Sequence, residues 1–185
     1  MEIILIILVV IFILLVWIIF MYNSLIRKRN QVRNAWSQIK VQLKRRYDLI
    51  PNLVSTVKEY MQHEKETLES ITKLRAQAME TTDVKDKAKV EGLLSRALGQ
   101  IKVAVENYPN LKANENFLML QEELKSTENK IAFSRQNYND QVLFFNNKIE
   151  MFPSNIIANM FNFKKEPFFE LEDPKEGEVV DVNFK

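Results

Sequence analysis

Few residues in this chain are of the types that carry out chemistry. It contains no cysteine, which excludes a thiol nucleophile and any disulfide bond. Its single histidine is His63. The Glu-x-x-His pair of di-iron bundles would need a glutamate three positions earlier, and Tyr60 stands there instead. We interpret His63 as a solvated surface side chain, and no Gly-rich phosphate loop is present. The sequence therefore predicts a protein that uses no metal or other cofactor and is not an enzyme.

Three charged residues interrupt rows of apolar residues that have helical spacing: Arg46, Glu128 and Arg135. A partly buried charge needs a partner, because leaving water without compensation is costly. We interpret the three as candidates for a polar network that fixes the register of packed helices. Arg46 and Glu128 are both expected in it, although not necessarily in direct contact. The alternatives are a binding groove that uses these groups and, with least support, a catalytic site.

The elements that position these residues begin with a long apolar run. Residues 3–21 contain no charge, no Gly and no Pro, and as a helix they span roughly 30 Å, the thickness of a bilayer's hydrocarbon core. Trp17 and Tyr22 lie near its C-terminal end, where aromatic side chains favour the interface. We predict a transmembrane helix over residues 1–22. A cleaved signal peptide and a buried helix of a soluble protein are the alternatives. A signal peptide would need a basic N-terminal region, and a buried helix at the edge of a core would need a polar side; the run has neither.

Basic residues after this run predict its orientation. Arg27, Lys28, Arg29 and Arg33 follow the run, and no basic residue precedes it. Because Lys and Arg beside a span stay on the cytoplasmic side, we expect the N-terminus outside the cell membrane and the body in the cytoplasm. These four side chains lie near enough to attract anionic lipid headgroups, at about 1 kcal/mol per charge. The basic residues of segment 40–46 lie beyond a Debye length of about 8–10 Å, so a solvated helix face explains them equally well.

The rest of the chain shows helical spacing almost throughout. Short connections between long helices imply antiparallel neighbours. We predict an all-α fold. The transmembrane helix continues into an elongated antiparallel up-and-down bundle of three to four helices over residues 23–163. An extended acidic tail over residues 164–185 follows the bundle. Large apolar residues of the clearest row recur every seven positions, as in coiled-coil packing, and we expect Tyr138 and Phe145 in the core. The row consists of Phe117, Leu124, Ile131, Tyr138, Phe145 and Phe152.

Several residues predict where helices begin and end. Asp83 is suited to cap a helix that Pro109 ends, and Asn110 to cap a long helix over residues 111–152. Pro153 stops that helix, and residues 154–163 follow as a short amphipathic helix. In the tail, the apolar residues between positions 179 and 184 could form a short strand or pack against the bundle.

Pro51 indicates either a kink or a break. Proline costs around 3 kcal/mol inside a helix, but no glycine or other turn signal accompanies it, and the apolar row keeps its phase across it. We favour one long kinked helix from the membrane to about residue 80. A tight hairpin near Pro51, with Asp48 capping the next helix, is the alternative.

Three strings of the sequence resemble the LemA family. They cover residues 22–60, 106–124 and 126–142, and they contain RRYDLIPNLV, YPNLKAN and TENKIAFSRQNYN in that order. The resemblance implies a bacterial protein with one N-terminal membrane helix and an antiparallel helical bundle. It implies no enzymatic activity and no catalytic residue that could be assigned here.

Two functional hypotheses follow. The first is a non-enzymatic membrane-anchored scaffold that presents a coiled-coil surface to another copy or another protein, and that organises the membrane by forming homo-oligomers. The second is a sensor or adaptor with a ligand groove between helices. A filled core favours the first, and a cavity of about 300 Å³ or more favours the second. The expected partners are the bilayer, another copy and an unidentified protein; nucleic acid is not expected, because the basic stretch lacks interleaved stacking aromatics.

Overall fold

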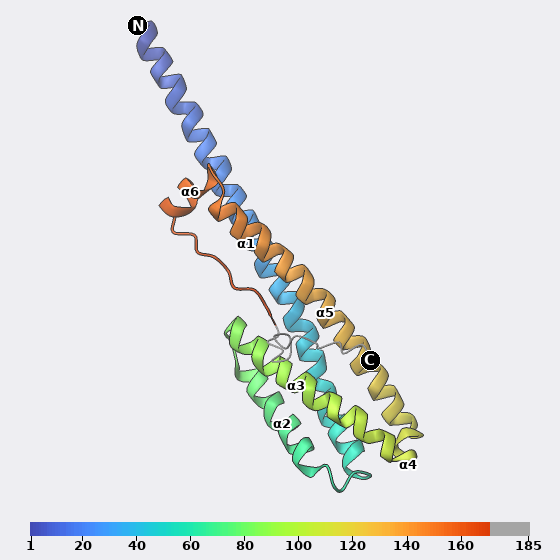
Figure 1. Cartoon of the computed structure of the whole chain (residues 1–185). Helices are drawn as coiled ribbons and strands as arrows, with labels where there is room; N and C mark the ends of the chain where they lie inside the picture. Colours follow the sequence, from blue (N-terminus) through green and yellow to red (C-terminus); the bar gives the residue numbers. More distant parts are fainter. Residues whose placement is uncertain (171–185) are drawn as a thin grey trace, which may run out of the picture. The chain divides into compact units, whose positions relative to one another are not determined.

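The computed structural model describes residues 1–170, and every regular element in this part of the chain is a helix. The predicted all-α fold, in which a long N-terminal helix packs against later helices of an up-and-down bundle, is confirmed. The helices are α1 (Glu2–Lys58), α2 (Lys65–Glu80), α3 (Val84–Ala104), the 3-10 turn η1 (Val105–Asn107), α4 (Pro109–Lys112), α5 (Glu115–Glu150) and α6 (Ser154–Met160) (Figure 1).

The chain divides into two compact units. Unit 1 consists of Met1–Ile39 and Phe133–Pro167, and unit 2 of Lys40–Ala132 together with residues 168–170. Both divisions fall inside helices, α1 and α5, so each unit contains one part of each of these two helices. The predicted domain boundaries at residues 22 and 163 stay a prediction.

In unit 1, two members of the row of apolar residues spaced by seven belong to the core. Tyr138 and Phe145 are completely buried, as predicted, and the Tyr138 ring lies 5.4 Å from the ring of Trp36 in α1. The Tyr138 hydroxyl donates a hydrogen bond of 2.8 Å to the carbonyl of Pro167. Burial, and then the nearby Glu166, raises the pKa of Tyr138, which keeps this donor neutral. The last member of the row, Phe152, lies outside the core, since it is 79% exposed.

An extended segment follows α6 in unit 1. The Asn146 side chain holds it through two hydrogen bonds to the backbone of Glu166, one donated and one accepted. Residues 164–170 form neither helix nor strand. The strand considered between positions 179 and 184 lies outside the described residues.

In unit 2, α1 packs with α2, α3 and the first part of α5. Buried apolar residues of all four helices form its core: Leu43, Ile50 and Val57 from α1, Ile71 from α2, Leu94 and Ile101 from α3, and Phe117 from α5. Helices α2 and α3 form an antiparallel pair (Figure 1). The predicted cap of α3 is confirmed, since the Asp83 carboxylate accepts hydrogen bonds from the backbone N–H groups of Lys85 and Asp86.

Helix α1 continues through Pro51 without a break. Proline has no N–H, so the carbonyl four residues earlier, that of Tyr47, loses its helical partner. Arg75 of α2 replaces this partner, because its Nε donates a 2.7 Å hydrogen bond to the Tyr47 carbonyl. The hairpin considered at Pro51 is therefore wrong.

The favoured alternative, one helix from the membrane to about residue 80, is wrong at its far end. Helix α1 ends at Lys58, and α2 begins at Lys65. Side chains from distant parts of the sequence hold the turn between α1 and α2. Tyr108 donates to the Glu64 carboxylate at 2.9 Å, and Asn114 donates to the Tyr60 hydroxyl at 3.2 Å. Met61, within the turn, is buried. No glycine or proline marks this turn, so the local sequence could not reveal it.

The start of α5 also differs from the prediction. The helix before Pro109 ends earlier than predicted, α3 at Ala104 and the 3-10 turn η1 at Asn107, and Pro109 instead opens the single turn α4, which contains Asn110. The side chain that caps α5 is Asn114, which accepts from the Phe117 N–H at 3.0 Å. Proline has a fixed φ that suits the first position of a helix, and this shifts the start of the long helix by one turn.

Candidate functional site

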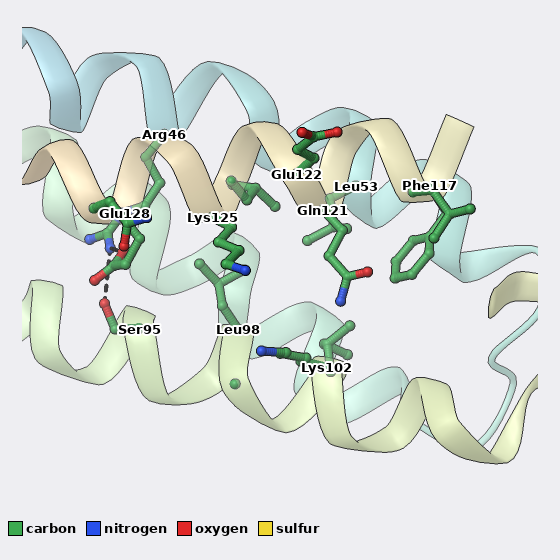
Figure 2. A pocket seen from close by; sticks show the side chains of 15 residues that line it. Arg46, Leu53, Ser95, Leu98, Lys102, Phe117, Gln121, Glu122, Lys125 and Glu128 are labelled. Carbon is green, nitrogen blue, oxygen red and sulfur yellow. Dashed lines mark hydrogen bonds and ion pairs between the residues drawn. The ribbon is translucent and has the colours of Figure 1, made fainter. Parts of the chain in front are cut away.

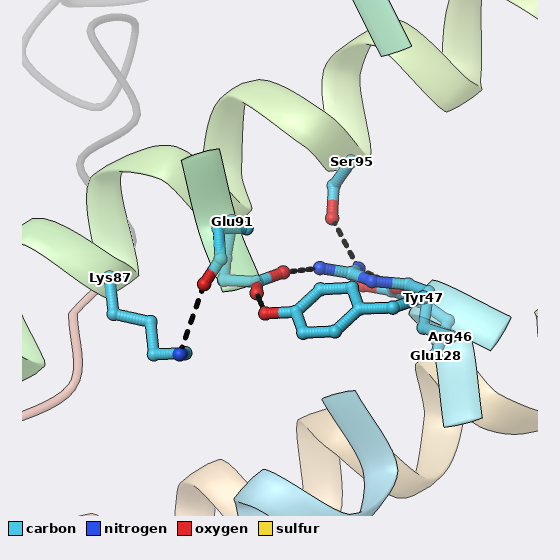
Figure 3. A network of polar contacts seen from close by, with 7 residues as sticks. Arg46, Tyr47, Lys87, Glu91, Ser95 and Glu128 are labelled. Atoms are coloured by element: carbon cyan, nitrogen blue, oxygen red, sulfur yellow. Dashed lines mark hydrogen bonds and ion pairs between the residues drawn. The ribbon is translucent and has the colours of Figure 1, made fainter. Parts of the chain in front are cut away.

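The centre of unit 2 holds a buried arginine. Arg46 of α1 is only 1% exposed, and its guanidinium contacts the carboxylates of Glu91 in α3 and Glu128 in α5 (Figure 3). The distance to Glu128 Oε2 is 2.7 Å, and a further hydrogen bond of 2.9 Å reaches the Ser95 hydroxyl. The planar guanidinium suits this position, because it offers several donors in fixed directions. Arg46 thus joins three helices of unit 2.

Glu91 has a second donor, the hydroxyl of Tyr47. Burial raises the pKa of Tyr47 to about 12, against an opposing effect of the Arg46 charge. The hydroxyl therefore stays protonated at physiological pH and continues to donate to the carboxylate. Glu91 is itself only 2% exposed, so the guanidinium and the phenol together replace the water that this carboxylate loses on folding.

Lys87 lies in the same unit and has a structural role. Its ammonium donates to the carbonyls of Ala78 at 3.1 Å and Thr81 at 2.8 Å, at the C-terminal end of α2. These carbonyls lack helical partners, and a cation at this end also interacts favourably with the negative end of the helix dipole. Burial, and then the charge of Lys40, lowers the pKa of Lys87.

The predicted network residues divide between the two units. Arg46 and Glu128 make a direct ion pair in unit 2, whereas Arg135 is half-buried in unit 1. Sequence reasoning missed Glu91 and Ser95. The signal was a gap in the apolar row of α3, where six positions separate Ala88 from Leu94; Glu91 stands at the position where an apolar residue would continue the row.

A groove opens beside this network between α3 and α5, with a volume of about 670 Å³. Arg46, Ser95 and Glu128 line one end, and Leu53, Ile101 and Phe117 provide apolar wall. The side chains of Lys102, Gln121 and Lys125 point into the space between the two helices (Figure 2). The volume lies within the range of about 300–1,000 Å³ that small-molecule sites occupy. Among residues 1–170, no three metal-ligating side chains come together to hold an ion.

The four basic residues after the apolar run lie in unit 1 and differ in their surroundings. Arg27 and Arg33 are exposed. Lys28 lies over the Phe144 ring at 5.3 Å, and Arg29 over the Phe163 ring at 5.2 Å. Because a cation over an aromatic face is stabilised there, Lys28 and Arg29 also contribute to packing within the unit.

The apolar run itself is a bare helix. Residues 1–15 are exposed, and the most apolar window of α1 has a mean hydropathy of 3.8 with none of it buried by the protein. Within the described part of the chain, α1 is the one helix long and apolar enough to cross a membrane. A core helix of a soluble protein would be covered, so this exposure favours a membrane anchor.

Comparison with known proteins gives two kinds of relative. A model of the LemA family matches residues 35–184. Protein LemA of Metamycoplasma hominis is 31% identical over 163 residues, which are 87% of this chain and 73% of that protein. Magnetosome proteins MamQ 1 and MamQ 2 of Paramagnetospirillum magneticum are each 29% identical over 80 residues, or 43% of this chain and 29% of theirs. The family match therefore includes the Arg46 network and the groove.

Proposed function

Since the chain belongs to the LemA family, we propose that it is a non-enzymatic, membrane-anchored helical scaffold that presents its bundle to other proteins at the membrane surface. The observation that carries this proposal is the course of α1. Residues 3–15 of this helix are apolar and exposed, and the same uninterrupted helix then supplies core residues such as Leu25 and Ile39. The anchor and the body are therefore continuous, without a linker between them.

The anchor is proposed to cross the cell membrane once, with the N-terminus outside and the body in the cytoplasm. The exposed Arg27 and Arg33 support this orientation, because basic residues beside a span stay cytoplasmic and are attracted to anionic headgroups.

Thiol labelling in intact cells tests the orientation. The chain has no cysteine, so single cysteines can be introduced at Glu2 and at the exposed Gln136 of α5. We expect a membrane-impermeant maleimide to label Glu2→Cys in intact cells and Gln136→Cys only after permeabilisation. The reverse pattern would contradict the orientation. As a control, replacing Arg27 and Arg33 with glutamine and adding lysines before the run should weaken or invert it.

Self-association is the second part of the proposal. Confinement to a membrane raises the effective concentration of the chains, so that weak contacts are sufficient. The seven-residue row is occupied inside the chain at Phe117, Tyr138 and Phe145, and association must use other surfaces. Helix α5 offers exposed apolar side chains outside this row, among them Phe133 and Met119.

Crosslinking in the native membrane tests self-association. Cysteines at the exposed Asn34 of α1 and Phe133 of α5 should give dimer or larger bands at native expression. Ala35→Cys is the matched control, because Ala35 adjoins Asn34 but is buried and should give monomer only. Monomer bands from every variant, with a positive control that crosslinks, would contradict assembly and favour a hetero-partner.

The groove of unit 2 favours a second candidate function, that of an adaptor or sensor binding a ligand or partner segment between α3 and α5. Its volume of about 670 Å³ exceeds what a filled scaffold core would leave. The buried charges at one end and the apolar wall beyond them would orient a ligand with one polar and one apolar end. Absence of crosslinked species in the preceding experiment would make this account the stronger one.

A further inference from the structure

The short helix α6 is apolar on two sides. One side, Ile157 and Ala158, is buried within unit 1. The other side carries Ile156 and Met160 four positions apart, and both are exposed. Together with neighbouring side chains they form what we call the α6 patch: Met151, Phe152, Ile156, Met160 and Phe161, which are between 48% and 79% exposed. The polar residues Asn155 and Asn159 lie between these apolar positions. Several large apolar side chains exposed within one short segment mark an interaction surface.

The patch adjoins the last turns of the apolar run of α1. The Phe161 ring lies 4.7 Å from the ring of Tyr22, the residue that directly follows the run, and the Phe163 ring lies 6.0 Å from it. The exposure of α1 first falls at residues 16–18, which are half-buried. Figure 1 shows α6 beside α1 where the bare part of α1 begins.

This position has a geometric consequence. Residues 3–21 are roughly 28 Å long as a helix, so that the whole run is needed to cross a hydrocarbon core of about 30 Å. Val16 lies only about 9 Å along the helix from Tyr22. When the run is fully inserted, its last turns reach the headgroup boundary, and the elements packed against them are brought to the same depth.

The charges near the patch are compatible with a lipid surface. No acidic residue occurs between Glu150 and Glu166, and Glu150 is paired with Lys165. Lys164 is exposed, as are Arg27 and Arg33 on α1. Phenylalanine and methionine side chains flanked by lysine and arginine are typical of segments that lie in the interfacial region.

We propose that α6 and the turn at Met151–Phe152 insert into the interface between headgroups and acyl chains, in the leaflet from which α1 emerges. The inference rests on the proposed membrane anchor. It adds a second contact with the membrane, made by side chains of the C-terminal segment of unit 1. Two contacts fix the rotation of α1 about its own axis, which a single span leaves free. They also account for Phe152, the one exposed aromatic member of the seven-residue row.

Depth-dependent fluorescence of the full-length protein in vesicles tests the proposal. An environment-sensitive probe is attached to single cysteines at Phe152 and Met160 in vesicles of phosphatidylcholine and phosphatidylglycerol. Phe133→Cys is the matched control: Phe133 is also a phenylalanine of unit 1, is 75% exposed, and lies roughly 26 Å along α5 from Glu150, the last residue of that helix before Met151 and Phe152. Ile11→Cys, in the middle of the apolar run, reports the anchor itself.

We expect the probes at positions 152 and 160 to show blue-shifted emission. Lipids that carry a spin label at the top of the acyl chain should quench roughly half of their fluorescence, because interfacial helices reach about 5–10 Å into this region. The probe at position 133 should not be quenched by these lipids, whether or not it lies at a contact between copies. Quenching at position 11 by lipids spin-labelled near the end of the acyl chain, with positions 152 and 160 behaving like 133, would overturn this inference and leave the anchor intact. No quenching at position 11 by these deeper labels would overturn the anchor and this inference together. Blue shifts at 152 and 160 without lipid quenching, growing with the protein-to-lipid ratio, would assign the patch to a second copy and overturn the lipid assignment.

Discussion

Replacing Arg46 with methionine should lower the free energy of unfolding by about 3–5 kcal/mol, because the substitution leaves Glu91 buried and without its charge partner. Methionine preserves most of the side-chain volume, so the loss measures the charge and its hydrogen bonds rather than a cavity. Chemical denaturation of the full chain in mild detergent, followed by helical circular dichroism, is the measurement.

The partners of Arg46 should respond differently. Glu91 has a side chain that is only 3% exposed, whereas that of Glu128 is 47% exposed. Removing Glu91 alone leaves Arg46 without its buried partner and should cost nearly as much as removing Arg46. Glu128→Gln should cost much less, because water replaces part of what the carboxylate provides. The double substitution Arg46→Met with Glu91→Met should cost less than the sum of the single ones, since it leaves no isolated charge.

Lys44→Met is the matched control for Arg46. Lys44 lies on the same helix and forms an ion pair with Asp48, but its side chain is 79% exposed. Its replacement should change stability by less than about 0.5 kcal/mol. If Arg46→Met had an equally small effect, the guanidinium would be accessible to water in solution, and the network would not hold the register of the three helices.

The contrast between Arg46 and Glu91 illustrates what the sequence could predict. Arg46 and Glu128 each stand out, because a charge inside an otherwise regular apolar row is visible from spacing alone. Glu91 occupies a gap between Ala88 and Leu94 in the row of α3, and a missing apolar residue is a weaker signal than a charge inside a regular row. Its importance comes from the packing of α3 against α1, and this three-dimensional relation is not encoded in the local pattern.

The same limit applies to the ends of helices. Asp83 was identified as a cap because its partners, Lys85 and Asp86, are two and three residues away. The continuation of α1 through Pro51 depends on Arg75, and the turn after Lys58 depends on Tyr108 and Asn114. The local signal was sufficient for the cap of α3, although at α5, where Asn114 accepts from the Phe117 N–H three residues on, it favoured Asn110. Where the contacts join distant segments, the sequence left two alternatives at Pro51, and neither was correct in full.

Truncating Phe145 to alanine should destabilise the protein by about 3–5 kcal/mol, the usual cost of removing a phenylalanine from a packed core. Phe145 is completely buried in unit 1, and its ring makes an edge contact with Phe163 at 6.4 Å. Alanine leaves a cavity where the ring was, and the surrounding side chains of α1 and α5 can close it only in part. Tyr138→Ala should have an effect of similar size for the same reason.

Two substitutions separate burial from other contributions to this effect. Tyr138→Phe retains the ring and removes only the hydrogen bond to the Pro167 carbonyl, so it should cost about 1 kcal/mol. Phe133→Ala removes an identical side chain from the same helix and unit, but Phe133 is 75% exposed, and its loss should cost less than about 0.5 kcal/mol. Equal denaturation midpoints for Phe145→Ala, Phe133→Ala and the unmodified chain would mean that the seven-residue row is not buried within one copy. In that case the row itself would be available for contacts between copies, and self-association through a coiled coil would become the better account of its spacing.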